Sequence, residues 1–403
     1  MRRPRTLRAP SFALLAVLTA ACSPRPETAA NNEPATEASA DVAKAPQGKP
    51  ADAKVEGEGK ADGAAKAPPT DTLANAEPSK APAEPEAAAD PLAPLPDEVR
   101  ERFASLPEDP KPDELIRNSH YWISNERNLQ LWHEHVKDLG GAYLGVGTDQ
   151  NYVLAGWAKS DLMVVVDFDA AIADLHQVYG LFFDAEETYE GFYQRWSPTR
   201  EAEGLAMIDE RLADHPNVKN IRKAYKIARQ LVWARLRIVR KSFEKHGIPT
   251  FVTDQEQYDH VRTLWRNGRV FARRGDFTAN ATMVALGKAM KDSSLAFNVI
   301  YLSNVEQYVD YTPEWRRNFL GLPVGDKGVV VRTLGWGGFG FVDEAEKYHY
   351  NVQPAPKFLA WLGESRVKNL PTMLHYRTRT DTQGLSLLDG EVKPSKKPPV
   401  IAE

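Results

Sequence analysis

Residues 142–166 constrain the fold more than any other part of the chain, because their pattern predicts a strand, a glycine turn, a helix and a second strand. A short apolar run at 142–144 leads into a turn that contains Gly145 and Gly147, and a helix is expected over about 151–158. The next apolar run, 162–166, is continuous and ends in polar residues, which is typical of a parallel strand covered on both faces. This order predicts half of a nucleotide-binding βαβ unit.

The turn and the tip of the second strand have the residue types that a ligand site needs. Gly145 and Gly147 let the backbone turn tightly and approach a ligand, while the next helix offers free N–H groups. Asp167 follows at the spacing where a carboxylate accepts both hydroxyls of a ribose. The alternative is that the Gly-x-Gly is only a tight turn and that 167–169 is only a strand end with a helix N-cap. The candidate ligand residues here are Gly145, Gly147, Asp149, Gln150, Asn151, Asp167 and Asp169.

Later strands repeat the pattern of an apolar run with a polar tip. A third strand is expected within 268–277, with Gly275 and Asp276 at its end, and a fourth within 295–304, ending in Ser303 and Asn304. Residues 327–333 supply a fifth. The carboxyl ends of parallel strands form the ligand crevice of doubly wound folds. We therefore predict an α/β, Rossmann-like, doubly wound and mostly parallel sheet, with these four tip residues in the crevice.

A long helical insertion is expected over about 189–245, between the second and third strands. An apolar stripe at steps of three and four predicts one packed helix face, and it consists of Ile221, Tyr225, Ala228, Val232, Leu236, Val239 and Phe243. The remainder is basic, with Lys219, Arg222, Lys223, Lys226, Arg229, Arg237, Arg240 and Lys241. One interpretation is a cap that meets anionic lipid head groups or an anionic substrate. We favour the other, a solvated face on a docked helix.

Two further segments carry expectations about local structure. Near-helical spacing of apolar residues predicts an amphipathic helix over 120–139, stopped by Gly140 and Gly141. The run 335–341 is too rich in glycine for the interior of a strand. We expect a mobile loop or a bend there, with a lid over the crevice as a further reading.

The N-terminus resembles a bacterial lipoprotein signal. Cys22 is the single cysteine of the chain and follows a basic start and a short apolar stretch, too short to span a bilayer. We predict a signal peptide over 1–21, a disordered Ala/Pro/Glu/Lys-rich tether over 22–96, a folded domain over 97–388 and a disordered tail over 389–403. An ordinary signal peptide cut nearby is the alternative. The expected location is the bacterial cell envelope, outside the cytoplasm, with a lipid anchor on Cys22.

Composition and missing motifs exclude several classes of protein. A net charge of −4 over 403 residues does not suggest a nucleic-acid partner. A lone cysteine provides neither disulfides nor thiolate metal ligands in the domain, and the scattered histidines give no metal motif. The sequence also lacks the nucleophile elbow of α/β-hydrolases and the phosphate loop of P-loop nucleotidases.

The segments 143–151, 166–169 and 301–308 resemble an uncharacterised bacterial lipoprotein family of leptospiral type. Its fold is similar to that of class I S-adenosylmethionine-dependent methyltransferases. The resemblance implies that the glycine loop faces the methionine part of this cofactor and that Asp167 faces the ribose. It also implies that Gly275 and Asp276 flank the adenine, and that Ser303 and Asn304 lie where cofactor and substrate meet.

The resemblance has departures that leave the activity open. Tyr143 and Leu144 stand before the loop, where methyltransferases typically carry an acid. Asn304, Glu306 and Tyr308 either orient a substrate or, as we favour, cap the next helix. No catalytic residue is assigned, since methyl transfer mainly needs close alignment.

Three functional hypotheses follow. The first is a lipid-anchored Rossmann-like domain that binds a nucleotide-like or other small ligand, or a partner, outside the cytosol. The second is an active methyltransferase, which requires a cytosolic fraction because its cofactor is made there. The third is a structural or surface lipoprotein with a vestigial pocket. The expected partners are the membrane, through the anchor, and a small molecule, and the oligomeric state stays open.

Overall fold

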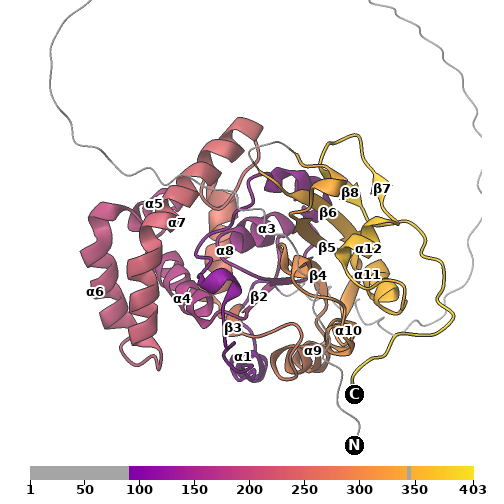
Figure 1. The fold of residues 1–403 in the computed structure, drawn as a ribbon. Helices are drawn as coiled ribbons and strands as arrows, with labels where there is room; N and C mark the ends of the chain where they lie inside the picture. The colour runs from indigo at the N-terminus through magenta and orange to yellow at the C-terminus, as the bar shows by residue number, and fades with distance from the viewer. Residues whose placement is uncertain (1–89, 343–345) are drawn as a thin grey trace, which may run out of the picture. The chain divides into compact units, whose positions relative to one another are not determined.

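The computed structural model describes residues 90–342 and 346–403, shown in colour in Figure 1. They belong to the unit Ala83–Glu403. The expected signal peptide and the expected tether up to residue 89, including Cys22, lie outside the described residues. Leu95, near the end of the segment predicted as a tether, is described and is buried.

The described part of the chain contains a single eight-stranded sheet in the order β3-β2-β1-β4-β5-β6-β8-β7. Its strands are β1 (Ala142–Gly145), β2 (Leu162–Asp167), β3 (Val270–Arg274), β4 (Phe297–Tyr301), β5 (Val324–Leu334), β6 (His349–Pro354), β7 (Thr378–Arg379) and β8 (Leu385–Leu387). β1 to β5 are parallel neighbours, β6 is antiparallel to β5 and parallel to β8, and β7 is antiparallel to β8. The predicted doubly wound, mostly parallel Rossmann-like sheet is confirmed.

Helices connect the parallel strands and bury them. They are α1 (Asp97–Ala104), α2 (His133–Val136), α3 (Gln150–Ala158), α4 (Ala170–Ala185), α5 (Tyr189–Arg195), α6 (Glu201–Arg211), α7 (Val218–His246), α8 (Gln255–Arg266), α9 (Thr282–Asp292), α10 (Pro313–Leu320), α11 (Ala355–Leu362) and α12 (Leu370–Leu374). β1 and β2 are buried throughout. Because the chain leaves β1 toward β3 and then returns past it to β4, right-handed crossovers place α3 and α4 on one face and α9 and α10 on the other.

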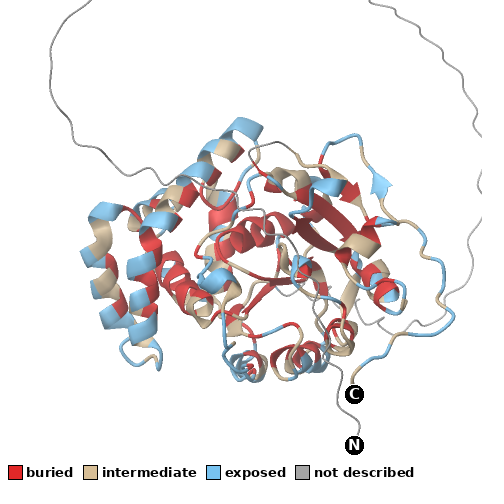
Figure 2. Ribbon diagram, in the orientation of Figure 1, coloured by how far each residue is buried: buried red, intermediate tan, exposed pale blue. Residues whose placement is uncertain are grey.

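The helical insertion between β2 and β3 is confirmed, and its core is α7. This helix is 29 residues long and packs against α4 and α6. All seven residues of the predicted apolar stripe are buried. Figure 2 shows the result: the central strands are buried, while the outer faces of α6 and α7 are exposed.

The predicted helix over 120–139 is wrong. Helical structure here is limited to the 3-10 turn η2 (Leu129–Trp132) and the four residues of α2. The preceding residues form neither helix nor strand, because several of their backbone N–H groups bond to side chains from distant segments instead of making helical hydrogen bonds. The pairs are Ser124 with Asp149, Arg127 with Glu346, and Asn128 with Tyr350.

The glycine-rich run and the C-terminal tail lie outside the long elements. Residues 335–341 form the bend between β5 and β6 and include the 3-10 turn η5 (Gly337–Phe339); movement of this loop as a lid stays a prediction. Residues 388–403 contain neither helix nor strand. The tail runs along the domain, where the Ser395 backbone N–H donates to Glu364 and the Ala402 N–H to the Pro313 carbonyl.

Candidate functional site

A cleft of about 790 Å³ lies at the carboxyl ends of the parallel strands. Each strand contributes the residues that follow it: Val146 and Gly147 after β1, Phe168 after β2, Gly275 after β3, Ser303 after β4 and Gly335 after β5. This is the edge where open α/β sheets bind ligands, and the volume is within the range of small-molecule sites. The far wall comes from the irregular segment before β1 and from α7.

The structure brings most of the predicted ligand residues to this cleft. Those that line it are Gly147, Gln150, Asp167, Gly275, Asp276, Ser303 and Asn304. The others, Gly145, Asp149, Asn151 and Asp169, are buried beside it and hold the loops in place.

The glycine loop after β1 is held on both sides by side chains. Gly147 has φ 80°, a left-handed conformation that favours glycine. Its N–H donates to Asp167 Oδ2 at 3.0 Å, and its carbonyl lies 2.8 Å from His176 Nε2. Burial lowers the pKa of His176 to about 4, so the neutral ring donates from Nε2 while Nδ1 accepts from Tyr152. Gly145 has a packing role, since a Cβ there would lie 1.9 Å from Asn151 Oδ1.

Asp167 connects the glycine loop to the tip of β2. Its Oδ1 accepts the Asp169 N–H at 2.9 Å, while Oδ2 accepts that of Gly147. The side chain is buried at the cleft wall. Burial raises the pKa of this carboxyl to about 7, despite the lowering effect of the two backbone donors. The group therefore exchanges its proton near neutral pH, in contact with the cleft.

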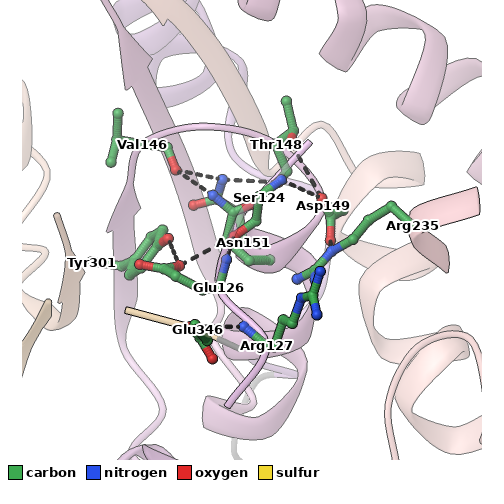
Figure 3. A network of polar contacts seen from close by, with 11 residues as sticks. Ser124, Glu126, Arg127, Val146, Thr148, Asp149, Asn151, Arg235, Tyr301 and Glu346 are labelled. Atoms are coloured by element: carbon green, nitrogen blue, oxygen red, sulfur yellow. Dashed lines mark hydrogen bonds and ion pairs between the residues drawn. The ribbon is translucent and has the colours of Figure 1, made fainter. Parts of the chain in front are cut away.

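Asp149 forms a buried ion pair with Arg235 of α7 (Figure 3). Arg235 Nε lies 2.9 Å from Asp149 Oδ2, and Oδ1 accepts the Ser124 N–H at 3.1 Å. Burial opposes the charge on Arg235, but the neighbouring carboxylate raises its pKa above the usual value. Asp149 thus joins the glycine loop, the insertion and the segment before β1. Arg235 lines the cleft and was missed by sequence reasoning, although its position three residues after Val232 and four before Val239 could have indicated its burial.

The side chains of Asn151 and Asp169 hydrogen-bond to backbone groups of the loops in which they lie. Asn151 Nδ2 donates to the carbonyls of Val146 and Thr148, at 3.0 and 2.9 Å, which shapes the turn. Asp169 caps α4 through the Ala171 N–H and lies 2.7 Å from His120 Nδ1. The N-cap alternative considered for this aspartate is what the structure shows.

Sequence reasoning missed the most deeply buried acid of the cleft, Glu126. Its side chain is 1% exposed and accepts hydrogen bonds from the hydroxyls of Tyr301, Ser303 and Thr333, the last two at 3.1 and 2.7 Å. Burial raises the pKa of Glu126, the hydroxyl donors lower it, and nearby Glu346 raises it further. Figure 3 shows Glu126 and Glu346 in one network with the Asp149 pair. No local motif marks Glu126, because its partners come from β4 and β5.

The motif 301–308 divides between the cleft and the core. Ser303 and Asn304 line the cleft, and Asn304 Nδ2 donates to the Tyr348 hydroxyl at 3.3 Å. Tyr308 also lines it and is 43% exposed. Glu306 instead forms a fully buried ion pair with Arg332 at 3.0 Å. A substrate role therefore remains compatible with Asn304 and Tyr308 but not with Glu306.

The lining of the cleft mixes aromatic and charged side chains. The aromatic residues are Tyr121, Phe168, Phe277, Tyr308, Trp315 and Tyr348, and the cationic residues are Arg117, Arg127, Arg235 and Lys347. Within residues 90–342 and 346–403, no group of three or more His, Cys, Asp or Glu side chains is placed to hold a metal ion. None of the helices in this same part of the chain is both long and apolar enough to cross a membrane.

The fold and the cleft define a Rossmann-like α/β domain with a ligand-sized site at the carboxyl edge of its sheet. The chain belongs to the family described as Domain of unknown function (DUF7790), whose model matches residues 121–389. The match begins in the segment that carries Glu126 and ends after β8. A search of curated proteins finds no match.

Replacing Arg235 by Met should lower the free energy of unfolding by about 3–5 kcal/mol, because Asp149 is left buried without its counter-charge. Urea denaturation followed by tryptophan fluorescence measures this. Arg237→Met, at an exposed position on the same helix, serves as the matched control and should change stability by less than about 0.5 kcal/mol. Adding Asp149→Asn to Arg235→Met should recover much of the loss. Equal free energies of unfolding for Arg235→Met and Arg237→Met would contradict the role of the ion pair.

The carboxyl of Asp167 should titrate with a midpoint near pH 7, as measured by ¹³C NMR of labelled aspartate. Since its folded pKa lies above the ordinary value of 3.8, the bound proton stabilises the fold fully below about pH 4 and this contribution is lost as the pH rises to about 7. Asp167→Asn should remove this part of the pH dependence of unfolding. A midpoint near 4 would overturn the assignment.

Proposed function

We propose that this domain binds a small molecule that contains a nucleoside, in the cleft at the carboxyl ends of β1 to β5. The observation that carries the proposal is Asp167, a buried carboxylate at the tip of β2 that lines the cleft beside Gly147. Each of its oxygens accepts one backbone N–H and keeps a second acceptor position. Two remaining acceptor positions suit the two hydroxyls of a ribose.

The neighbouring strand tips fit the rest of such a ligand. Phe168 and Phe277 follow β2 and β3 at the cleft wall, where aromatic surfaces favour contact with a flat base. Asp276 is exposed at the same tip, and one of its oxygens binds Thr278. Arg127 and Arg235 line the cleft on the side of the segment before β1 and α7, which suits a carboxylate or phosphate at the other end of the ligand.

S-adenosylmethionine is the first ligand to test, since the residues present fit it. Asp167 would hold its ribose, the tips of β2 and β3 its adenine, and Arg127 and Arg235 its carboxylate. When bound, this cofactor supplies an activated methyl group. Methyl transfer is the second candidate function, favoured by Glu126, a buried carboxyl in the cleft with a raised pKa that suits removal of a proton from a nucleophile.

Calorimetric titration of the full chain with S-adenosylmethionine, S-adenosylhomocysteine and adenosine tests the proposal. We expect micromolar Kd values for at least one of them, and a loss of about tenfold or more in Asp167→Asn, the effect of losing hydrogen bonds to a charged group. Phe168→Ala should also weaken binding, whereas Asp292→Ala, at an exposed position of α9 outside the cleft lining, should not.

Thermal unfolding of each variant confirms that the protein titrated is folded. A folded wild-type chain that binds none of the three ligands would refute nucleoside binding and favour a surface lipoprotein with a vestigial pocket.

We also propose that the domain is anchored in the bacterial cell envelope by a lipid on Cys22, supported by the basic, apolar and small-residue order before this cysteine. The wild-type chain expressed in a bacterium should partition into the detergent phase of Triton X-114, and Cys22→Ser should move it to the aqueous phase. Labelling with radioactive palmitate should be lost in the same variant. Identical partitioning and labelling of both chains would rule out the anchor.

A further inference from the structure

The outer face of α7 carries exposed apolar residues next to the cleft. Ile227, Leu231 and Ile238 are 46%, 44% and 46% exposed. At 3.6 residues per turn they lie within about 40° of one another around the helix axis, along about 16 Å of its length. Ile238 also lines the cleft. These three side chains therefore form an apolar strip on the exposed face of α7, and the strip leads to the mouth of the cleft.

Basic residues flank this strip. The exposed cations of α7 are Lys219, Lys223, Lys226, Arg237, Lys241 and Lys245. By helical geometry Lys223 and Lys241 lie within about 40° of Ile227, on the side opposite Leu231. Glu244 is the acid among the exposed residues of α7. The outer face thus combines one sign of charge with apolar side chains.

The structure separates these cations from others that are already neutralised. Arg222 bonds to Asp209 at 2.9 Å, and Arg229 is buried against Glu201. Arg240 pairs with Glu190 at 2.6 Å. The three acids in these pairs come from α5 and α6, which pack beside α7. Five of the eight basic residues predicted as one solvated face are exposed and lie outside these three ion pairs: Lys219, Lys223, Lys226, Arg237 and Lys241. Of these, Lys223 and Lys241 lie nearest the apolar strip.

We propose that α7 docks the domain on an anionic phospholipid surface, with Ile227, Leu231 and Ile238 entering the interface and the flanking cations binding head groups. A helix with an apolar strip bordered by lysines and arginines has the chemistry of interfacial membrane helices, and clustered cations add electrostatic attraction to anionic lipids. Docking in this way brings the mouth of the cleft to the lipid surface. The inference concerns the outer face of α7 and does not depend on the ligand in the cleft.

Vesicle co-sedimentation with the full chain carrying Cys22→Ser, which removes the proposed lipid anchor, tests the docking surface. We expect binding to vesicles of phosphatidylcholine and phosphatidylglycerol at low salt, and at least tenfold weaker binding to phosphatidylcholine alone. The triple variant Lys223→Glu, Lys226→Glu, Lys241→Glu should abolish binding. Its matched control is the triple variant Lys288→Glu, Lys291→Glu, Lys327→Glu, which changes the net charge equally at exposed positions outside α7. This control should retain most of the vesicle binding.

Two further variants separate insertion of α7 from a general charge effect. Ile227→Ser with Leu231→Ser should weaken binding at least tenfold at unchanged charge, whereas Arg222→Gln, which removes a paired cation, should leave it within twofold. Circular dichroism melts confirm that each variant is folded. The proposal is overturned if wild type does not bind the anionic vesicles, or if the α7 and control triple variants bind them equally.

Discussion

The buried ion pair between Asp149 and Arg235 is the contact on which the arrangement of the cleft depends. It joins the loop after β1 to a helix inserted between β2 and β3, and the same carboxylate receives a backbone N–H from the segment before β1. Burying two charges has a large desolvation cost, which is offset only by good geometry and further hydrogen bonds. Here three separate parts of the chain are required to meet for that cost to be offset, so the cleft walls form together.

Several polar groups at the cleft already have partners in the protein. Asp167 holds the glycine loop, His176 holds it from the other side, and Glu126 gathers hydroxyls from β4 and β5. Groups held in this way are preorganised, because a ligand need not order them on binding. The buried carboxyls also have raised pKa values, so their protonation states respond to a ligand that enters the cleft.

The insertion relates the cleft to the outer surface. One face of α7 is buried and delivers Arg235 to the loop after β1, while the opposite face is exposed and carries the apolar strip with its lysines. A single rigid helix therefore links the geometry of the site to the surface on which the domain would dock. With the domain docked as proposed, the orientation of the cleft would decide which ligands reach it.

The sequence by itself determined the order of β1 to β5, the helical insertion and the buried stripe of α7, because hydrophobic periodicity and glycine positions are local properties. It also placed Gly147, Asp167, Gly275 and Ser303 at one sheet edge, which follows from parallel topology. Only the tertiary structure decided that 120–128 is not helical, that Glu126 lies in the cleft and that Asp149 pairs with Arg235. Each of these depends on partners far away in the sequence, and the hydrogen bonds of a buried polar group are set by which segments meet.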